Sequence, residues 1–265
     1  MTIKIKLIKK SILFVSTFLL LVSCSSDDKQ TVITKTQLVM QDEFDTNGSL
    51  DQSLWSYNIG TGTNGWGNNE LQYYTDRPEN IIVENGMLKI TAREELFLGA
   101  SYTSARILTK GKYEKKYGRI EARIKLPWGK GLWPAFWMIG ANSDTVIWPQ
   151  CGEIDIMEHK GNDLNRIYGT LHYPGRSGGN ADGNTRVISN ATTEFHIYKV
   201  EWTAASIKIY VDDQIIHTVA NSSAIPFNHE FFLILNVAMG GTFGGAVDPN
   251  FTNATMEVDY VRVSL

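Results

Sequence analysis

Residues 152–159 read Gly-Glu-Ile-Asp-Ile-Met-Glu-His and place three carboxylates within six positions. Acidic and apolar side chains alternate here, which is typical of a half-buried β-strand. On a regular strand Glu153 and Asp155 share one face, whereas Glu158 lies five positions from Glu153 and points to the other face. A β-bulge, one extra residue near Met157, would return Glu158 to the acidic face, and bulges are common beside active sites. The stretch therefore predicts three acids in a row on one face of a sheet.

This acidic row suits acid–base chemistry better than it suits a stable fold. Like charges repel, so at least one of the three carboxyl groups is expected to have a raised pKa. The alternative is a solvated acidic face on a surface strand. The apolar neighbours Ile154, Ile156 and Met157 argue against that alternative, and so does the apolar run at 133–137, which reads Trp-Pro-Ala-Phe-Trp. Acids beside a row of tryptophans indicate a carbohydrate cleft.

The tryptophan run predicts a second strand over residues 132–139. Trp133, Ala135 and Trp137 are spaced two apart and share a face of this strand. The small Ala135 between two indoles leaves a slot in which a pyranose ring could lie. The alternative is core packing, because tryptophan is often buried. The acids expected on the next strand favour the cleft.

The rest of the chain reads as short strands joined by turn signals. Asn85-Gly86 between two apolar runs is a strong hairpin signal. Residues 103–108 read as one strand, residues 117–126 as a strand with one wet face, and residues 231–239 as an apolar central strand. More than ten such strands, in a chain of 265 residues that is 43% hydrophobic, predict an all-β domain built as a two-sheet antiparallel β-sandwich.

Two glycine-rich loops accompany these strands. Residues 65–74 read Gly-Trp-Gly-Asn-Asn-Glu-Leu-Gln-Tyr-Tyr, which suits a loop that offers hydrogen bonds and a stacking plane to a sugar. An ordinary loop with a buried tryptophan is the alternative. Residues 240–245 are rich in glycine but lack the Lys-Ser/Thr pair of a phosphate-binding loop, so that interpretation is rejected.

The N-terminal residues predict a secretion signal and not a part of the fold. Four lysines lie within the first ten residues, and an apolar segment at 12–22 is too short to span a bilayer comfortably. Residues 21–24, Leu-Val-Ser-Cys, resemble the lipobox of bacterial lipoproteins. In that family the signal is cut before the cysteine, here Cys24, and the cysteine is lipidated. The alternative is an ordinary signal peptide that happens to contain a cysteine.

The lipobox divides the chain into a signal peptide at 1–23, a polar tether at 24–36 and one β-sandwich domain at 37–265. The acids Asp27 and Asp28, which follow Cys24 after two serines, resemble a surface-export signal of bacterial lipoproteins. We therefore expect a lipid anchor in the cell envelope, in the outer membrane. Whether the protein faces the periplasm or the exterior stays open.

The net charge and the cysteine content limit which binding partners and which disulfide bonds the sequence allows. Removal of the signal takes away four lysines and no acid, which leaves 21 basic and 28 acidic residues and a formal net charge of −7. No basic patch indicates a nucleic-acid partner. Besides Cys24 the mature chain contains only Cys151, so an intrachain disulfide is excluded. A monomer is expected.

With these residues in view, the chain resembles glycoside hydrolase family 16, and within it the laminarinases, which are endo-β-1,3-glucanases. The resemblance spans residues 42–261. Its most specific part is residues 148–158, Trp-Pro-Gln-Cys-Gly-Glu-Ile-Asp-Ile-Met-Glu, with the bulged pattern E-x-D-x-x-E that laminarinases, agarases and carrageenases share. Similar stretches are 65–75, 132–138, 169–174 and 232–241. The resemblance implies a concanavalin A-like β-jelly roll with the substrate cleft on its concave face.

The resemblance also implies roles for single residues. Glu153 would be the nucleophile, Glu158 the general acid and base, and Asp155 the residue between them that tunes their protonation. No cofactor is implied for catalysis. The residues that would line the cleft are Trp133, Trp137, Asn68, Arg106, Trp148 and His172.

A structural calcium ion on the convex side is common in this family. The matching positions here are Glu43, the backbone carbonyl of Gly86, and Asp259. Hard oxygen ligands of this kind suit Ca²⁺. The alternative is that these acids are simply exposed.

Three classes of function are compatible with a sugar-binding sandwich. The first is an enzyme that hydrolyses β-1,3-glucan of the laminarin type by retaining endo action, with mixed-linkage β-1,3-1,4-glucan as a second substrate. Agar and carrageenan are rival substrates, but anionic carrageenan calls for a basic cleft, which a net charge of −7 does not suggest. The second is a non-catalytic β-glucan-binding surface lipoprotein, and the presence of all three acids decides against it. The third, a structural adhesin, leaves the rows of tryptophan and glutamate unexplained.

Overall fold

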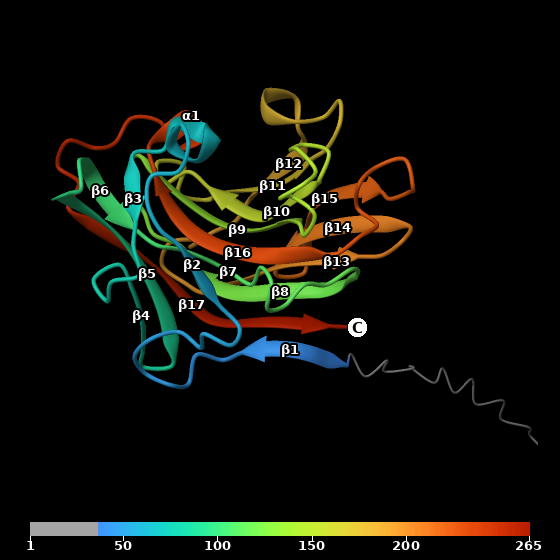
Figure 1. Ribbon diagram of the computed structural model, residues 1–265, viewed down its shortest axis with the longest axis horizontal. Helices are drawn as coiled ribbons and strands as arrows, with labels where there is room; N and C mark the ends of the chain where they lie inside the picture. The colour runs from blue at the N-terminus through green and yellow to red at the C-terminus, as the bar shows by residue number, and fades with distance from the viewer. Residues whose placement is uncertain (1–36) are drawn as a thin grey trace, which may run out of the picture. The chain divides into compact units, whose positions relative to one another are not determined.

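The structure is a computed structural model that describes residues 37–265. The predicted signal peptide, Cys24 and the predicted tether lie outside these described residues. Within the described part, no helix is long and apolar enough to cross a membrane. This part consists mainly of β-strands arranged in two layers (Figure 1).

Ten strands form one layer, which we name the outer sheet. Its order is β15 (Gln214–Ala220), β14 (Ser206–Val211), β13 (His196–Trp202), β8 (Gly118–Lys125), β17 (Asn253–Ser264), β5 (Met87–Phe97), β6 (Ala100–Ser104) and β3 (Gln72–Tyr74), with β1 (Leu38–Asp42) paired to β17 and β4 (Ile81–Glu84) paired to β5.

Seven strands form the second layer, the inner sheet. Its order is β12 (Asp182–Val187), β11 (Arg166–His172), β10 (Glu153–His159), β9 (Leu132–Gly140), β16 (Phe231–Met239), β7 (Arg106–Leu108) and β2 (Ser56–Asn58). The inner sheet is antiparallel, whereas the outer sheet contains one parallel pair, β3 with β6. The prediction of an all-β two-sheet sandwich is confirmed.

In residues 37–265 three short helical turns lie in the loops, η1 (Gly65–Asn69), η2 (Gly178–Asn180) and α1 (Gly241–Gly244). The loops that carry η1 and α1 lie against each other, and a bridge joins Glu70 to Gly240. A Cβ atom added at Gly241 would lie 2.9 Å from the carbonyl oxygen of Asn68. Glycine at this position, where φ is +71°, therefore lets the two loops pack closely.

The hydrophobic core lies between the two sheets. On the inner sheet it includes Ile154 and Ile156 of β10, and on the outer sheet Ile120 and Ile124 of β8, all four fully buried. Burial of a side chain of this size contributes about 1.5–3 kcal/mol. The isoleucines thus fix which face of β10 is turned towards the outer sheet and leave the acidic residues for the opposite face.

The predicted bulge is present in β10. Against β9, Asp155 pairs with Trp137, Met157 with Phe136 and Glu158 with Ala135, so two steps along β10 match one step along β9. The register against β11 shifts over the same segment, between Asp155 and Glu158. The extra residue returns Glu158 to the face of Asp155, as the alternation predicts.

The prediction of one strand over residues 103–108 is wrong. The chain forms two strands there, β6 in the outer sheet and β7 in the inner sheet, separated by the buried Ala105. Both halves are extended, so periodicity alone does not reveal that the chain crosses between layers. The crossing places Arg106 on the inner sheet, opposite Asn236 of β16.

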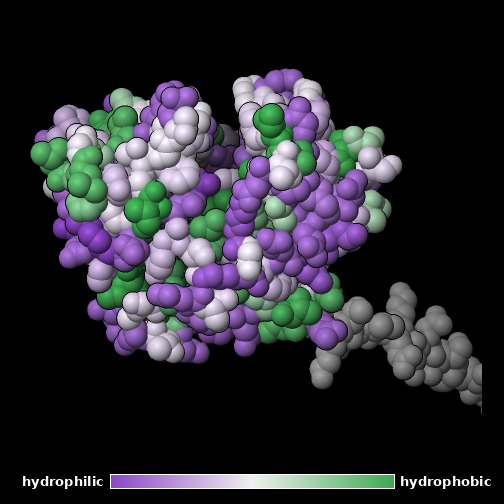
Figure 2. All heavy atoms as spheres, in the orientation of Figure 1, coloured by the Kyte–Doolittle hydropathy of each residue, from purple (hydrophilic) through white to green (hydrophobic). Residues whose placement is uncertain are grey.

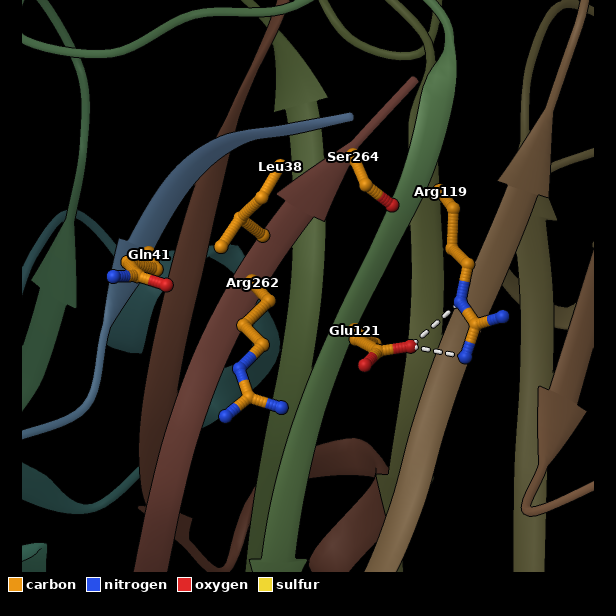
Figure 3. A pocket seen from close by; sticks show the side chains of 6 residues that line it. All are labelled: Leu38, Gln41, Arg119, Glu121, Arg262 and Ser264. Atoms are coloured by element: carbon orange, nitrogen blue, oxygen red, sulfur yellow. Dashed lines mark hydrogen bonds and ion pairs between the residues drawn. The ribbon is translucent and has the colours of Figure 1, made fainter. Parts of the chain in front are cut away.

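Two other strand predictions are confirmed. Asn85 and Gly86 connect β4 to β5 with φ of +57° and +72°, as a tight hairpin turn requires. The outward face of β8 is wet, and Figure 3 shows Arg119 beside Glu121 in a shallow pocket on the outer sheet. That ion pair lies within one strand, whereas Arg123 pairs across to Asp259 of β17.

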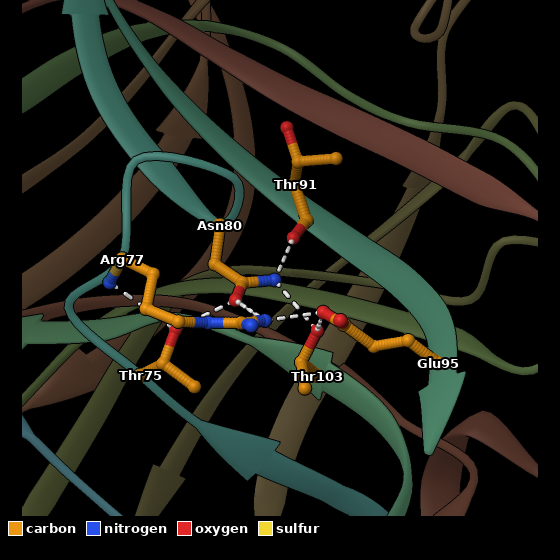
Figure 4. A network of polar contacts seen from close by, with 6 residues as sticks. All are labelled: Thr75, Arg77, Asn80, Thr91, Glu95 and Thr103. Atoms are coloured by element: carbon orange, nitrogen blue, oxygen red, sulfur yellow. Dashed lines mark hydrogen bonds and ion pairs between the residues drawn. The ribbon is translucent and has the colours of Figure 1, made fainter. Parts of the chain in front are cut away.

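A polar network fastens the segment between β3 and β4 to β5 and β6 (Figure 4). The buried Asn80 accepts a hydrogen bond from Thr75 at 2.6 Å and donates to Thr103 Oγ1 at 2.9 Å. Thr103 in turn donates to Glu95, which also pairs with Arg77. The Thr103 hydrogen bond and the Arg77 charge hold the pKa of Glu95 below its usual range, against the opposing effect of burial.

Replacement of Glu95 tests this network. A depressed pKa in the folded state contributes stability above the unfolded-state pKa, and that stability is lost as the pH falls through the folded value. Glu95→Gln should therefore lower the free energy of unfolding by about 1 kcal/mol at neutral pH. Denaturant unfolding as a function of pH measures the effect. The difference from wild type should shrink in acid, and the exposed neighbour Glu94→Gln serves as control. A pH-independent difference would contradict the assignment.

Candidate active site

The three acids predicted from sequence lie together on β10, on the face away from the core. Asp155 and Glu158 are only 4% and 8% exposed, and the Glu153 side chain is 18% exposed. Figure 2 shows the surface hollowed on the side where α1 and β12 lie in Figure 1. Buried carboxyl groups require hydrogen-bond or charge partners, and the neighbouring strands provide them.

Glu158 is held by residues from the strands on both sides of it. The indole N–H of Trp133 on β9 donates to Glu158 Oε1 at 3.1 Å, and the hydroxyl of Thr170 on β11 donates to Oε2 at 3.4 Å. Trp133, predicted to line the cleft, therefore also orients an acid. Its ring lies against Phe243, with centroids 5.1 Å apart.

His172 on β11 faces the other two acids. Its Nε2 lies 3.2 Å from Asp155 Oδ2 and 3.7 Å from Glu153 Oε1. Its Nδ1 accepts a hydrogen bond from the backbone N–H of Gly178 at 3.1 Å. In the neutral ring the proton is therefore on Nε2, which points at the two carboxylates.

Glu153, Asp155 and His172 are also the residues of this site that could hold a metal ion. One ligand atom from each lies within 4.8 Å of the others. A metal-bound Nε2 would have to give up its proton, and Nδ1 would then carry a proton against the Gly178 N–H. With this proton on Nε2, His172 is not placed to bind a metal ion.

Burial raises the pKa of Glu153, Asp155 and Glu158, each to about 8. For Glu153 and Glu158 the charge of Asp155 adds to this effect, whereas His172 opposes it. The predicted rise is thus present, but its first cause is loss of solvent and not repulsion. The titrations of the three carboxyl groups are coupled to one another. The positive charge of Arg106 lowers the pKa of Glu153. We therefore expect Glu153 to ionise first while Glu158 keeps its proton.

Aromatic side chains and Arg106 form a wall beside the acids. The Arg106 guanidinium lies between the rings of Trp66 and Trp137, 4.6 and 4.8 Å from their centroids. The Trp137 indole N–H donates to Asn236 Oδ1 at 2.8 Å. The hydrogen bond fixes the edge of the Trp137 ring and Arg106 covers one of its faces, so a sugar can contact only the ring surface that Arg106 leaves free.

Two further predicted cleft residues are placed near this wall and the acids. Trp148 is 43% exposed, and its ring centroid lies 5.6 Å from that of His172. Asn68 lies in η1, where its amide donates to Glu70 at 3.4 Å. The exposure of Trp148 makes its ring available to a ligand, whereas the Asn68 amide is turned towards a protein partner.

Some residues of this region were not singled out from sequence. The Trp66 ring lies against the Arg106 guanidinium. The only sequence signal for a role of Trp66 in the cleft was its position in a Gly/Asn-rich loop. Asn236 is the one polar residue in the apolar run 231–239, a signal that sequence reasoning could have used. Glu70 accepts hydrogen bonds from three neighbours, and no local pattern distinguishes it from a surface acid.

The predicted calcium positions meet at one junction in the outer sheet. Asp42 at the end of β1 pairs with Val261, and Leu88 near the start of β5 pairs with Val258. Glu43 and Gly86 thus lie beside the irregularity in β17 that contains Asp259. Both carboxylates have arginine partners. Glu43 accepts from Arg262 at 2.7 and 2.8 Å, and Asp259 accepts from Arg123 at 2.6 Å.

Comparison with known proteins agrees with this geometry. The sequence pattern of glycosyl hydrolases family 16 matches residues 68–262. A beta-glucanase of Rhodothermus marinus is 42% identical over 262 residues, which cover 92% of this chain and 91% of that protein. Glucan endo-1,3-beta-glucosidase A1 of Niallia circulans is 40% identical over 85% of this chain, although the match spans only 37% of that longer protein.

A solved structure gives the same result. The catalytic domain of an endo-1,3-beta-glucanase (laminarinase) from Thermotoga petrophila RKU-1 superimposes with a TM-score of 0.81 at 45% identity, covering 87% of this chain and 98% of that domain. The chain therefore belongs to glycosyl hydrolases family 16. It is a glycoside hydrolase, in which the acids of β10 form the candidate catalytic centre.

Removal of one hydrogen bond to Glu158 should shift the pH dependence of catalysis. The Trp133 N–H favours the ionised carboxylate and so lowers the pKa of Glu158 against the larger effect of burial. Trp133→Phe should raise that pKa, and a general acid works while it is protonated. The basic limb of the kcat/KM profile should move to higher pH, with kcat reduced about tenfold.

Initial rates as a function of pH measure this shift. Trp128→Phe is the matched control, because Trp128 is 69% exposed in the turn before β9. A basic limb that stays in place in Trp133→Phe would show that Trp133 does not act on the acid.

Proposed function

We propose that this protein is a retaining endo-β-1,3-glucanase that acts on laminarin-type polysaccharide, with mixed-linkage β-1,3-1,4-glucan as a second substrate. The observation that carries the proposal is the row of Glu153, Asp155 and Glu158 on the bulged strand β10, next to Trp137 and Trp148. The similarity to an endo-1,3-beta-glucanase domain over most of the chain supports the same substrate class.

In the first step, a carboxylate oxygen of Glu153 attacks the anomeric carbon of the sugar. The bond from that carbon to the glycosidic oxygen breaks, and the proton of Glu158 passes to the leaving oxygen. In the second step a water molecule attacks the same carbon, gives its proton to Glu158 and releases Glu153. Two displacements at one carbon retain the β configuration.

Asp155 and His172 influence the protonation states of Glu153 and Glu158 that these two steps need. Asp155 lies between the two glutamates in sequence and raises the pKa of both through its charge. The Nε2 proton of His172 faces Asp155 and Glu153, so it favours their ionised forms. Glu153 thereby serves as the nucleophile while Glu158 holds the proton that the leaving group needs.

Replacement of the two glutamates should separate their roles. Glu153→Ala should reduce turnover of every substrate by at least about 10⁴-fold, because the nucleophile is lost. Glu158→Ala should spare part of the turnover of aryl glycosides, whose good leaving groups need little protonation. Proton NMR of the first product measures the stereochemistry. A β anomer is expected first, and an α anomer would contradict these two roles.

The substrate is tested by product analysis on laminarin, lichenan, agarose and carrageenan side by side. Oligosaccharides from laminarin, with slower release from lichenan, are expected. Release from agarose or carrageenan alone would favour the rival substrates. Binding of laminarin without any cleavage would favour the non-catalytic glucan-binding alternative.

A structural Ca²⁺ at Glu43, the carbonyl of Gly86 and Asp259 is part of the proposal. The convergence of β1, β5 and β17 supports it, and oxygen donors suit the ion. Arg262 occupies both oxygens of Glu43, so the ion would have to displace that guanidinium. Binding therefore exchanges one partner of Glu43 for another, and the net stabilisation should be moderate.

Calcium binding should be visible in the melting temperature. An ion that binds only the folded protein stabilises it by mass action, about 2.7 kcal/mol at 100 times the dissociation constant. Metal-free protein should therefore melt several degrees lower than calcium-loaded protein. Glu43→Gln should remove the shift, and Glu94→Gln, an exposed acid further along β5, should keep it. Equal melting curves with and without calcium would contradict the site.

Lipidation at Cys24 completes the proposal, and Leu-Val-Ser-Cys at 21–24 supports it. Expressed in a bacterium that processes lipoproteins, the wild type should fractionate with membranes. Cys24→Ala should appear in the soluble fraction or remain unprocessed, whereas Ser25→Ala should behave as wild type. A wild type that is soluble and carries no lipid by mass spectrometry would contradict the anchor.

A further inference from the structure

Glu70, at the end of the η1 loop, has an unusual set of partners for a half-buried acid. Its Oε2 accepts hydrogen bonds from Gln72 Nε2 at 2.7 Å and from Tyr74 Oη at 3.0 Å. Its Oε1 accepts from Asn68 Nδ2 at 3.4 Å. Gln72 and Tyr74 are fully buried. An ionised carboxylate only accepts hydrogen bonds, so all three neighbours must donate to it.

The requirement that Tyr74 donate to Glu70 fixes the direction of the hydrogen bonds that connect Glu70 to Trp137 in the cleft. Tyr74 gives its single proton to Glu70, so its oxygen can only accept from Asn236, whose Nδ2 lies 3.1 Å away. The Asn236 amide is then oriented with Oδ1 towards Trp137, which donates to it at 2.8 Å. Each donor in the series Trp137, Asn236 and Tyr74 points towards Glu70.

Arg106 connects the same acid to the catalytic centre. Its half-buried side chain has the guanidinium over the rings of Trp66 and Trp137, and loss of solvent lowers its pKa. The carboxylates of Glu70 and Glu153 act in the opposite direction and favour its charge. Arg106 is therefore a cation whose charge is favoured by both Glu70 and Glu153.

We propose that Glu70 is a positioning residue: its carboxylate sets the orientation of Trp137 through Tyr74 and Asn236, and it balances the charge of Arg106 beside Glu153. The proposal rests on the proposed function, because Trp137 and Glu153 are the ring and the nucleophile that the substrate would meet. The side-chain hydrogen bonds of Glu70 in the described structure go to Asn68, Gln72 and Tyr74 and to none of the three acids of β10.

Glu70→Gln keeps the size of the side chain but replaces one acceptor oxygen by an amide that donates. One acceptor oxygen then remains for three donors, so Tyr74 can turn its proton to Asn236. The Asn236 amide must flip to accept it, which leaves an N–H group against the N–H of Trp137. Trp137 thus loses its partner, and the sugar platform loses its fixed orientation.

The same change acts on the nucleophile by charge. The charges that act on the pKa of Glu153 are those of Asp155, His172, Glu158 and Arg106. Loss of the Glu70 charge leaves Arg106 with Glu153 as its acidic partner, so the pKa of Glu153 should fall. The nucleophile works while it is ionised, so the acid limb of kcat/KM should move to lower pH.

The experiment compares Glu70→Gln, Glu70→Asp, Tyr74→Phe and the surface control Glu84→Gln, with kcat and KM for laminarin across pH. Glu70→Gln should raise KM about tenfold, the effect of one lost buried hydrogen bond, with a smaller change in kcat and a shifted acid limb. Glu70→Asp should restore the position of the limb. Tyr74→Phe should raise KM without moving the limb, because the Glu70 charge remains.

An independent measurement is the indole Nε1–H signal of Trp137 in a ¹H–¹⁵N spectrum, which needs no substrate. It should move in Glu70→Gln and stay in Glu84→Gln. A wild type that does not cleave laminarin would refute the proposed function and leave this signal to decide on Glu70. An unmoved Trp137 signal, or a KM and acid limb in Glu70→Gln equal to those of wild type, would overturn the positioning role.

Discussion

One extra residue in β10 is the constraint on which the site depends. The bulge around Ile156 lets the strand keep its isoleucines against the outer sheet while Glu158 turns to the same side as Asp155. Without the extra residue, Glu158 would point into the core, where an unpaired ionised carboxylate costs several kcal/mol. The strand is therefore apolar on one side and acidic on the other only because its register shifts by one residue.

Placing three carboxyls side by side has a cost that the surroundings offset. Trp133 and Thr170 hold Glu158, His172 faces Asp155 and Glu153, and a cation acts on Glu153. These partners come from the strands on either side of β10 and from β7. The inner sheet thus serves both as a layer of the core and as the frame that keeps the acids partly protonated, which a double displacement requires.

Short sequence patterns predict the features of this protein that depend only on neighbouring residues. Alternation predicts the acidic row and its bulge, and Asn85-Gly86 predicts its hairpin. The pattern fails at Ala105, since both flanking segments are extended and only strand pairing shows the change of sheet. It also misses the partners of Glu43 and Tyr74, because Arg262 lies 219 positions from Glu43 and Asn236 lies 162 positions from Tyr74. Such contacts exist only once the sheets have assembled.

The central claim is that Glu153 is the nucleophile of a retaining hydrolase, and covalent trapping tests it most directly. A β-glucoside with fluorine at C2 and a good leaving group should form a stable glycosyl-enzyme, because the second displacement is slowed. Peptide mass spectrometry should then find the sugar on Glu153, in the peptide that also contains Asp155 and Glu158. A sugar attached to Glu158 or Asp155, or inactivation that labels none of the three, would contradict the account.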